Sequence, residues 1–93
     1  MEIYLVEHYR PGADAAGMRA EAAGLRDAAA QLDREGLSIR YLRSTIVPAD
    51  EAFLSLFEAS SEAAVCQAHA RADVAFERIS AAIAAEPDLK EKP

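Results

Sequence analysis

The spacing of apolar residues alternates between a strand repeat and a helix repeat along this chain, and that order most constrains the fold. Residues Glu2–Tyr9 and Ala52–Ala59 are short runs rich in β-branched, aromatic and aliphatic side chains, which favours strands. Over residues 14–35, apolar side chains recur every three or four positions, which is typical of one helical face. Asp14 is placed to cap this helix and Gly36 to end it.

The full pattern predicts six elements. They are expected at residues 2–9 (strand), 14–35 (helix), 37–47 (strand), 52–59 (strand), 60–72 (helix) and 76–83 (strand). The last segment is ambiguous, because Ile79 and Ile83 alternate as in a strand while its alanines equally suit a helix; we interpret it as a strand. This order is typical of the ferredoxin-like βαββαβ fold, an α+β fold with both helices on one face of a four-stranded antiparallel sheet. We expect one domain over residues 1–85 and a flexible tail over 86–93.

Composition narrows the class of protein. The chain has 93 residues, a net charge of -6 and 22 alanines, so it is one small acidic domain with few large apolar side chains. It has neither an apolar run of about 20 residues nor a signal-peptide pattern, so we expect a cytoplasmic protein with no membrane partner. A single cysteine excludes an internal disulfide, and the absence of a basic stripe argues against nucleic acid as a partner.

Both faces of the predicted sheet carry large apolar side chains. The first strand places Ile3 and Leu5 on one face and Tyr4 and Val6 on the other. Two small helices cover one face only, and large exposed apolar patches are rare in soluble monomers. We therefore expect a homodimer in which two sheets pack face to face, as in a dimeric α/β barrel. The alternative is that these exposed apolar residues are ordinary.

Three stretches of the chain resemble a known family. They are IYLVEHYRPG at 3–12, IRYLRSTIVPADEAFLSLFEASSEAAVCQAHARA at 39–72 and FERISAAI at 76–83. Together they resemble a family of small ferredoxin-like domains whose best-described member is a bacterial nickel-binding protein. The resemblance implies a ferredoxin-like homodimer with surface affinity for divalent nickel, and no known catalytic cycle. The chain departs from the family pattern at His8, Tyr41 and Asp73, where arginine, tryptophan and glycine are common.

Two glutamates are candidate metal ligands. We take the first and third strands to be parallel neighbours in the sheet, which would bring Glu7 and Glu58 together at one end, near Arg40. Two close carboxylates could bind a cation or take part in acid–base chemistry. The alternative is that they form structural ion pairs with Arg40 or Arg43.

Two histidines complete the candidate ligand set. His8 follows Glu7 but points to the opposite face of the strand, and it could instead be a hydrogen-bonded surface group. His69 lies three residues after Cys66 on the second helix, so both could reach one metal ion; alternatively, both belong to the core. Since no cluster supplies three or four ligands, a bound nickel ion would keep several waters and its affinity would be modest and pH-dependent.

Three functions remain open at this stage. The first is a cytoplasmic nickel-binding homodimer, with ligands among Glu7, His8, Glu58 and His69. The second is a dimeric α/β-barrel enzyme or small-molecule-binding protein whose pocket between the sheets is lined by Glu7, Tyr41, Arg43 and Glu58. The third is an interaction module without a ligand. No catalytic residue is identified, because the serines lack the nucleophile-elbow motif and Cys66 has no evident activating partner except His69.

Overall fold

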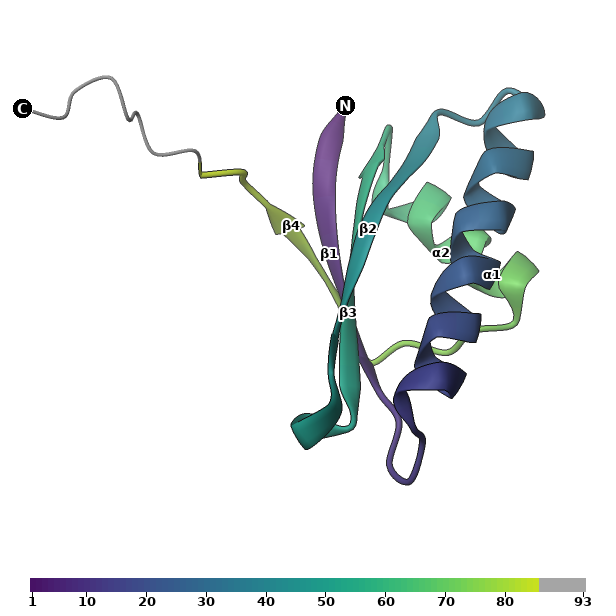
Figure 1. Cartoon of the computed structure of the whole chain (residues 1–93). Coiled ribbons are helices and arrows are strands. Elements are labelled where there is room, and N and C mark those ends of the chain that lie inside the picture. Colours follow the sequence, from purple (N-terminus) through teal and green to yellow (C-terminus); the bar gives the residue numbers. More distant parts are fainter. Residues whose placement is uncertain (86–93) are drawn as a thin grey trace, which may run out of the picture.

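The computed structural model describes residues 1–85, and the predicted tail at 86–93 lies outside these residues. The elements are β1 (Glu2–Tyr9), α1 (Ala15–Arg34), β2 (Ile39–Val47), the 3-10 turn η1 (Pro48–Asp50), β3 (Ala52–Ala59), α2 (Glu62–Ala72) and β4 (Arg78–Ala82). The strands form one antiparallel sheet in the order β2-β3-β1-β4. Both helices lie on the same side of this sheet (Figure 1). The predicted βαββαβ fold is confirmed.

The core lies between the helices and the sheet. Every second side chain of β1 and β3 is buried there: Tyr4, Val6, His8, Phe53, Ser55, Phe57 and Ala59. α1 packs Met18, Leu25 and Leu32 against them, as its three-and-four spacing predicts. The Asp14 side chain accepts the Gly17 N–H at 2.8 Å, so the predicted cap fixes the start of this helix.

α2 ends at an aspartate in a conformation that favours glycine. Asp73 has φ 56° and ψ 45°, in the left-handed region, where a residue with a Cβ is strained by about 1 kcal/mol. The helix nevertheless ends tightly, because the Val74 N–H donates to the His69 carbonyl at 3.0 Å. The glycine that the family pattern has at this position is therefore not needed to form the turn.

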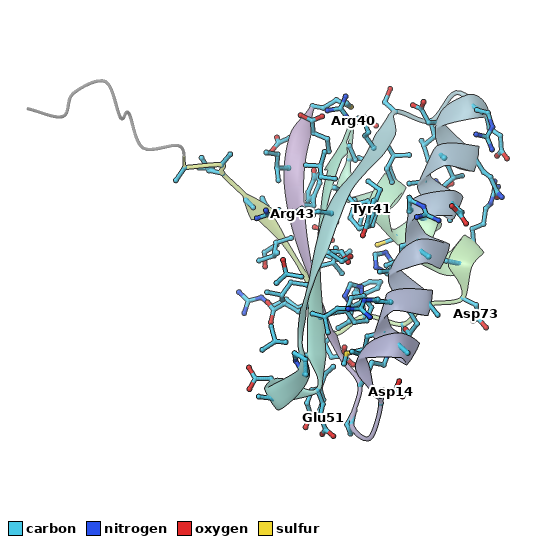
Figure 2. The ribbon with its side chains drawn as sticks, viewed as in Figure 1. Asp14, Arg40, Tyr41, Arg43, Glu51 and Asp73 are labelled. Atoms are coloured by element: carbon cyan, nitrogen blue, oxygen red, sulfur yellow. The ribbon has the colours of Figure 1, made fainter. Side chains whose placement is uncertain are left out.

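β2 contains a β-bulge. Tyr41 pairs with Phe57 of β3, but the next residue of β3, Leu56, pairs with Arg43, so Leu42 is an extra residue. Beyond the bulge the alternation of side chains reverses. Tyr41 therefore faces the helices while Arg43 lies on the opposite face (Figure 2). In a regular strand Tyr41 and Arg43 would share a face, as the predicted pocket that includes both of them requires, and this prediction is wrong.

The face of the sheet away from the helices carries a second apolar set. Its central side chains, Ile3 and Leu5 of β1 and Leu54 and Leu56 of β3, are half-buried. The two-sided apolar pattern predicted from the sequence thus exists in the folded chain. It fits the expected homodimer, which stays a prediction.

Candidate functional site

The two candidate glutamates lie at opposite ends of the sheet. β1 and β3 are antiparallel, and Glu7 pairs with Leu54 whereas Glu58 pairs with Ile3. The prediction that these strands are parallel neighbours is wrong. The crossover through α1 makes β2 run parallel to β1, and the hairpin through η1 then reverses the chain, so β3 runs against β1.

Each of these glutamates instead forms an ion pair with an arginine. Glu58 lies 3.2 Å from Arg40, the partner considered in the alternative interpretation, and Glu7 lies 3.7 Å from Arg78. Both arginine side chains are exposed, so water screens these pairs and each contributes little to stability. The carboxylates remain accessible to a ligand from solvent.

The two candidate histidines meet in the core. His8 of β1 and His69 of α2 are 1% and 2% exposed, and their Nε2 atoms are 2.9 Å apart. The ring centroids are 5.2 Å apart with an angle of 20° between the planes. A centroid separation of 5.2 Å is about the largest that an Nε2–Nε2 distance of 2.9 Å allows. The two rings therefore meet edge to edge through their Nε2 atoms and lie nearly in one plane. Neither histidine is the exposed group that a surface metal site would require.

The hydrogen bonds of this pair need three protons. Nδ1 of His8 lies 3.0 Å from the Phe53 carbonyl, and Nδ1 of His69 lies 2.8 Å from the Val65 carbonyl. A carbonyl oxygen only accepts, so each Nδ1 carries a proton. The contact between the Nε2 atoms needs a third proton, whereas two neutral imidazoles carry two.

Burial opposes that third proton. Desolvation lowers the pKa of His8, the hydrogen bond to the Phe53 carbonyl opposes this, and the charges of His69 and Arg10 add to the lowering; the net result is a fall from 6.5 to about 4. Desolvation also lowers the pKa of His69, and Arg10 again adds to the effect. Both rings are therefore neutral near pH 7, which leaves two nitrogen lone pairs pointing at each other.

Aromatic side chains enclose the histidine pair. Phe53 stacks on His8 with 4.0 Å between ring centroids, and Phe76 meets His69 edge to face at 5.0 Å. Phe57 also packs near His69, with 5.6 Å between the ring centroids and 57° between the ring planes. No carboxylate forms a hydrogen bond or ion pair with either ring among residues 1–85.

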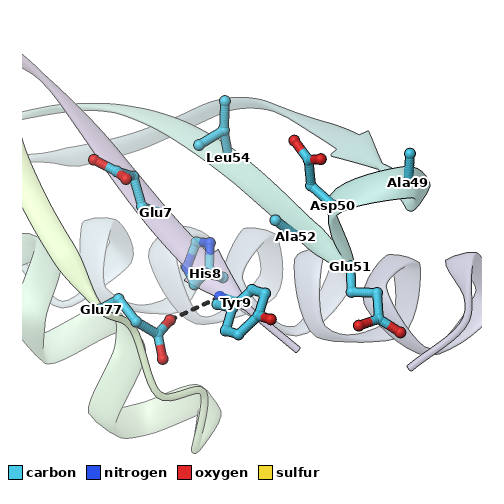
Figure 3. Close-up of a pocket in the computed structure, with 9 residues that line it drawn as sticks. All are labelled: Glu7, His8, Tyr9, Ala49, Asp50, Glu51, Ala52, Leu54 and Glu77. Carbon is cyan, nitrogen blue, oxygen red and sulfur yellow. Dashed lines mark hydrogen bonds between the residues drawn. The ribbon is translucent and has the colours of Figure 1, made fainter. Parts of the chain in front are cut away.

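An acidic hollow lies where β1 ends beside η1 (Figure 3). Its volume is about 710 Å³, and its lining is Glu7, His8, Tyr9, Ala49, Asp50, Glu51, Ala52, Leu54 and Glu77. Glu77 accepts the Tyr9 N–H at 2.7 Å, and Glu51 accepts the Gly12 N–H at 3.1 Å. Within residues 1–85, no three His, Cys, Asp or Glu side chains converge closely enough to hold a metal ion as they stand.

Cys66 and His69 line a second hollow of about 370 Å³. Nδ1 of His69 donates to the Val65 carbonyl, and Nε2 of His69 lies against His8 in the core. The arrangement therefore does not present His69 and Cys66 as joint ligands of one ion, and it favours the interpretation of His69 as a core residue.

Comparison with known proteins identifies the family. The family model of the nickel-responsive SCO4226-like proteins matches residues 4–81. The chain belongs to this SCO4226-like family. The structure is similar to the crystal structure of SCO4226 from Streptomyces coelicolor A3(2), with a TM-score of 0.68 and 17% identity over 90% of this chain and 99% of that one. A search of curated proteins gave no match.

These findings confirm the family resemblance and the ferredoxin-like fold of this SCO4226-like chain. No helix within residues 1–85 is both long and apolar enough to cross a membrane. The family is named for its response to nickel, which is the coarse part of the function predicted from the sequence.

Of the residues predicted to line a small-molecule pocket between two sheets, Tyr41 lies on the wrong face in this SCO4226-like chain. Tyr41 lies under the helices, where its hydroxyl donates to Ser44 Oγ at 2.7 Å, and Arg43 lies on the other face. The two side chains therefore cannot line one pocket between the sheets.

Sequence reasoning also missed two features of the site. The acidic hollow collects Asp50, Glu51 and Glu77 beside Glu7, and no local motif marks residues so far apart in the chain. The histidine pair did leave a signal. His8 alternates with the buried Tyr4 and Val6, and His69 lies on the inward stripe of its helix, so both were predictable as core residues.

Proposed function

We propose that this SCO4226-like protein is a nickel-binding homodimer whose ion binds in the acidic hollow and keeps most of its water ligands. The nickel-responsive family name supports the choice of ion. The observation that carries the site is the lining of the hollow, which among residues 1–85 includes four carboxylates, from Glu7, Asp50, Glu51 and Glu77, and neither arginine nor lysine. Carboxylate oxygens and a nearby negative field attract a hydrated divalent cation.

The affinity of this site should be modest. Since no three ligating side chains converge in the described part of the chain, the ion would be held by one or two carboxylates, with water at the remaining positions. Two arginines reduce the negative field, because Arg78 lies 3.7 Å from Glu7 and Arg10 lies 3.7 Å from Glu77. Salt screens the attraction between the remaining negative charge and the ion, so nickel binding should weaken as the salt concentration rises.

The proposed homodimer would place a second chain close to the hollow. Glu7 and Leu54 pair across β1 and β3 on the open face of the sheet, and both also line the hollow. A partner sheet packed on the apolar set Ile3, Leu5 and Leu56 would reach this wall. Such a partner would exclude water from the apolar face and could add carboxylates of its own to the ion.

Calorimetric titration of tag-free protein with nickel chloride tests the site. Glu7→Gln and Asp50→Asn each remove one carboxylate charge from the hollow, and each should weaken nickel binding several-fold. Glu58→Gln is the matched control, because it removes the same charge from the opposite end of the sheet. Nickel binding that is unchanged in both hollow variants, or weakened equally in the control, would contradict the proposed site.

The mass in the same buffer tests the assembly. The proposed homodimer has twice the chain mass of 10.0 kDa. A folded particle of the single-chain mass at micromolar concentration would contradict the homodimer while leaving the nickel titration interpretable. The two halves of the proposal are thus tested separately.

A further inference from the structure

The buried histidine pair is not needed for nickel binding in the hollow, and its geometry indicates a ligand of another class. When both rings are neutral, each Nδ1 proton is held by a backbone carbonyl and the two Nε2 lone pairs oppose each other across 2.9 Å. Opposed lone pairs on two buried rings are unfavourable, because neither nitrogen then has a donor. A cation between the two nitrogens would satisfy both.

The surroundings restrict the charge of that cation. His8 and His69 are almost fully buried and lie among Phe53, Phe57 and Phe76. No described carboxylate forms a hydrogen bond or ion pair with either ring. A divalent ion would leave two uncompensated positive charges in an apolar interior, which is costly. A monovalent ion adds only the charge that a shared proton would add.

The direction of the lone pairs restricts the coordination geometry. The rings meet edge to edge through their Nε2 atoms, so the two Nε2 lone pairs lie on one straight line. An ion between them would have the two nitrogens on opposite sides. An octahedral ion such as hydrated nickel needs further ligands, for which the phenylalanine shell offers no polar atom. Copper(I) and silver(I) are d¹⁰ ions that accept two nitrogen ligands in a line.

We propose that His8 and His69 form a binding site for one monovalent, linearly coordinated metal ion, with copper(I) as the biological ion of that class. The ligand atoms are the two Nε2 atoms. The carbonyls of Phe53 and Val65 hold the Nδ1 protons and so present Nε2 to the metal, the role that such partners have in other histidine metal sites.

Binding requires the rings to move apart. With metal–nitrogen bonds of about 2 Å, the Nε2 atoms would stand about 4 Å apart, which is about 1 Å farther than the observed 2.9 Å. Each histidine borders a hollow, of about 710 Å³ for His8 and about 370 Å³ for His69, and the two rings would have to move towards these hollows.

Titration with silver nitrate in chloride-free buffer tests the site, because silver(I) is stable in air. The Cys66→Ser variant is used, since the half-buried Cys66 thiol would compete for the same ion. One equivalent of silver should shift the Nε2 resonances of both histidines in nitrogen-15 spectra of the imidazoles, while each Nδ1 remains protonated. Copper(I) added under anaerobic conditions should displace the silver.

Variants separate this site from the nickel site. In the Cys66→Ser background, His69→Gln should weaken silver binding at least tenfold, whereas Glu7→Gln should weaken nickel binding and leave silver binding unchanged. The inference is overturned if silver shifts the Nε2 resonance of only one histidine or of neither. It is also overturned if silver binds the His69→Gln variant as tightly as the protein with both histidines. Should His69→Gln fail to fold, the spectra of the variant with both histidines still decide, because they report each nitrogen directly.

Discussion

Acidification should destabilise this protein through its buried histidines. Burial holds the pKa of His8 at about 4 in the folded chain, below the 6.5 of an unfolded histidine, so the unfolded chain binds more protons between these two values. The free energy of unfolding should be constant above pH 6.5 and fall as the pH drops towards 4. For His8 alone the loss at pH 4 is about 3 kcal/mol, since one pKa unit corresponds to about 1.4 kcal/mol. His69, whose pKa is also lowered, adds in the same direction.

Urea unfolding across this pH range measures the effect. The upper part of the range reports the histidines, because the nearest competing contribution, from the Glu35 carboxylate held by Arg71, begins only near the ordinary pKa of 4.5. The double variant H8Q/H69Q is the control, and its free energy of unfolding should not change between pH 6.5 and 5. A free energy of unfolding that rises on acidification would refute the reasoning, because the folded pair would then bind the third proton more strongly than the unfolded chain does.

Three further predictions concern stability and assembly. Phe57→Ala should lower the free energy of unfolding by about 4 kcal/mol, because the ring is fully buried; a loss below about 1 kcal/mol in urea unfolding would contradict its place in the core. Asp73→Gly should raise this free energy by about 1 kcal/mol by relieving the left-handed conformation, and an unchanged thermal midpoint would show that the aspartate is not strained. Leu56→Asp should convert the proposed dimer into a folded particle of 10.0 kDa, and a retained dimer would exclude the open face as the interface.

Most of the fold was predictable because local spacing determines it. The helix predicted over residues 14–35 is observed at Ala15–Arg34, and both central strands have the predicted bounds. The ambiguous segment over residues 76–83 contains β4 at Arg78–Ala82, where pairing with β1 rather than local composition decides for a strand. The bulge was not predictable, because a leucine at position 42 suits a strand whether or not it has a partner.

The site was less predictable because it depends on strand direction and on contacts between distant segments. The candidate pairing of Glu7 with Glu58 followed from one wrong strand direction. The correct partners, His8 and His69, are 61 positions apart, and their contact requires β1 and α2 to be packed together first. Their inward positions were visible in the sequence, whereas the contact of one ring nitrogen with another was not.

Because of the extra residue in β2, the effect of deleting one residue from this strand depends on which residue is lost. A chain without Leu42 would let Arg43 follow Tyr41 directly, opposite the same two residues of β3 that these side chains already face. Deletion of Thr45 instead would shift the pairing with β3 by one residue on one side of the deletion, and the β2 side chains there would point to the wrong face of the sheet. Length variants of this strand in related proteins should therefore cluster at position 42, where a codon can be lost without repacking the core.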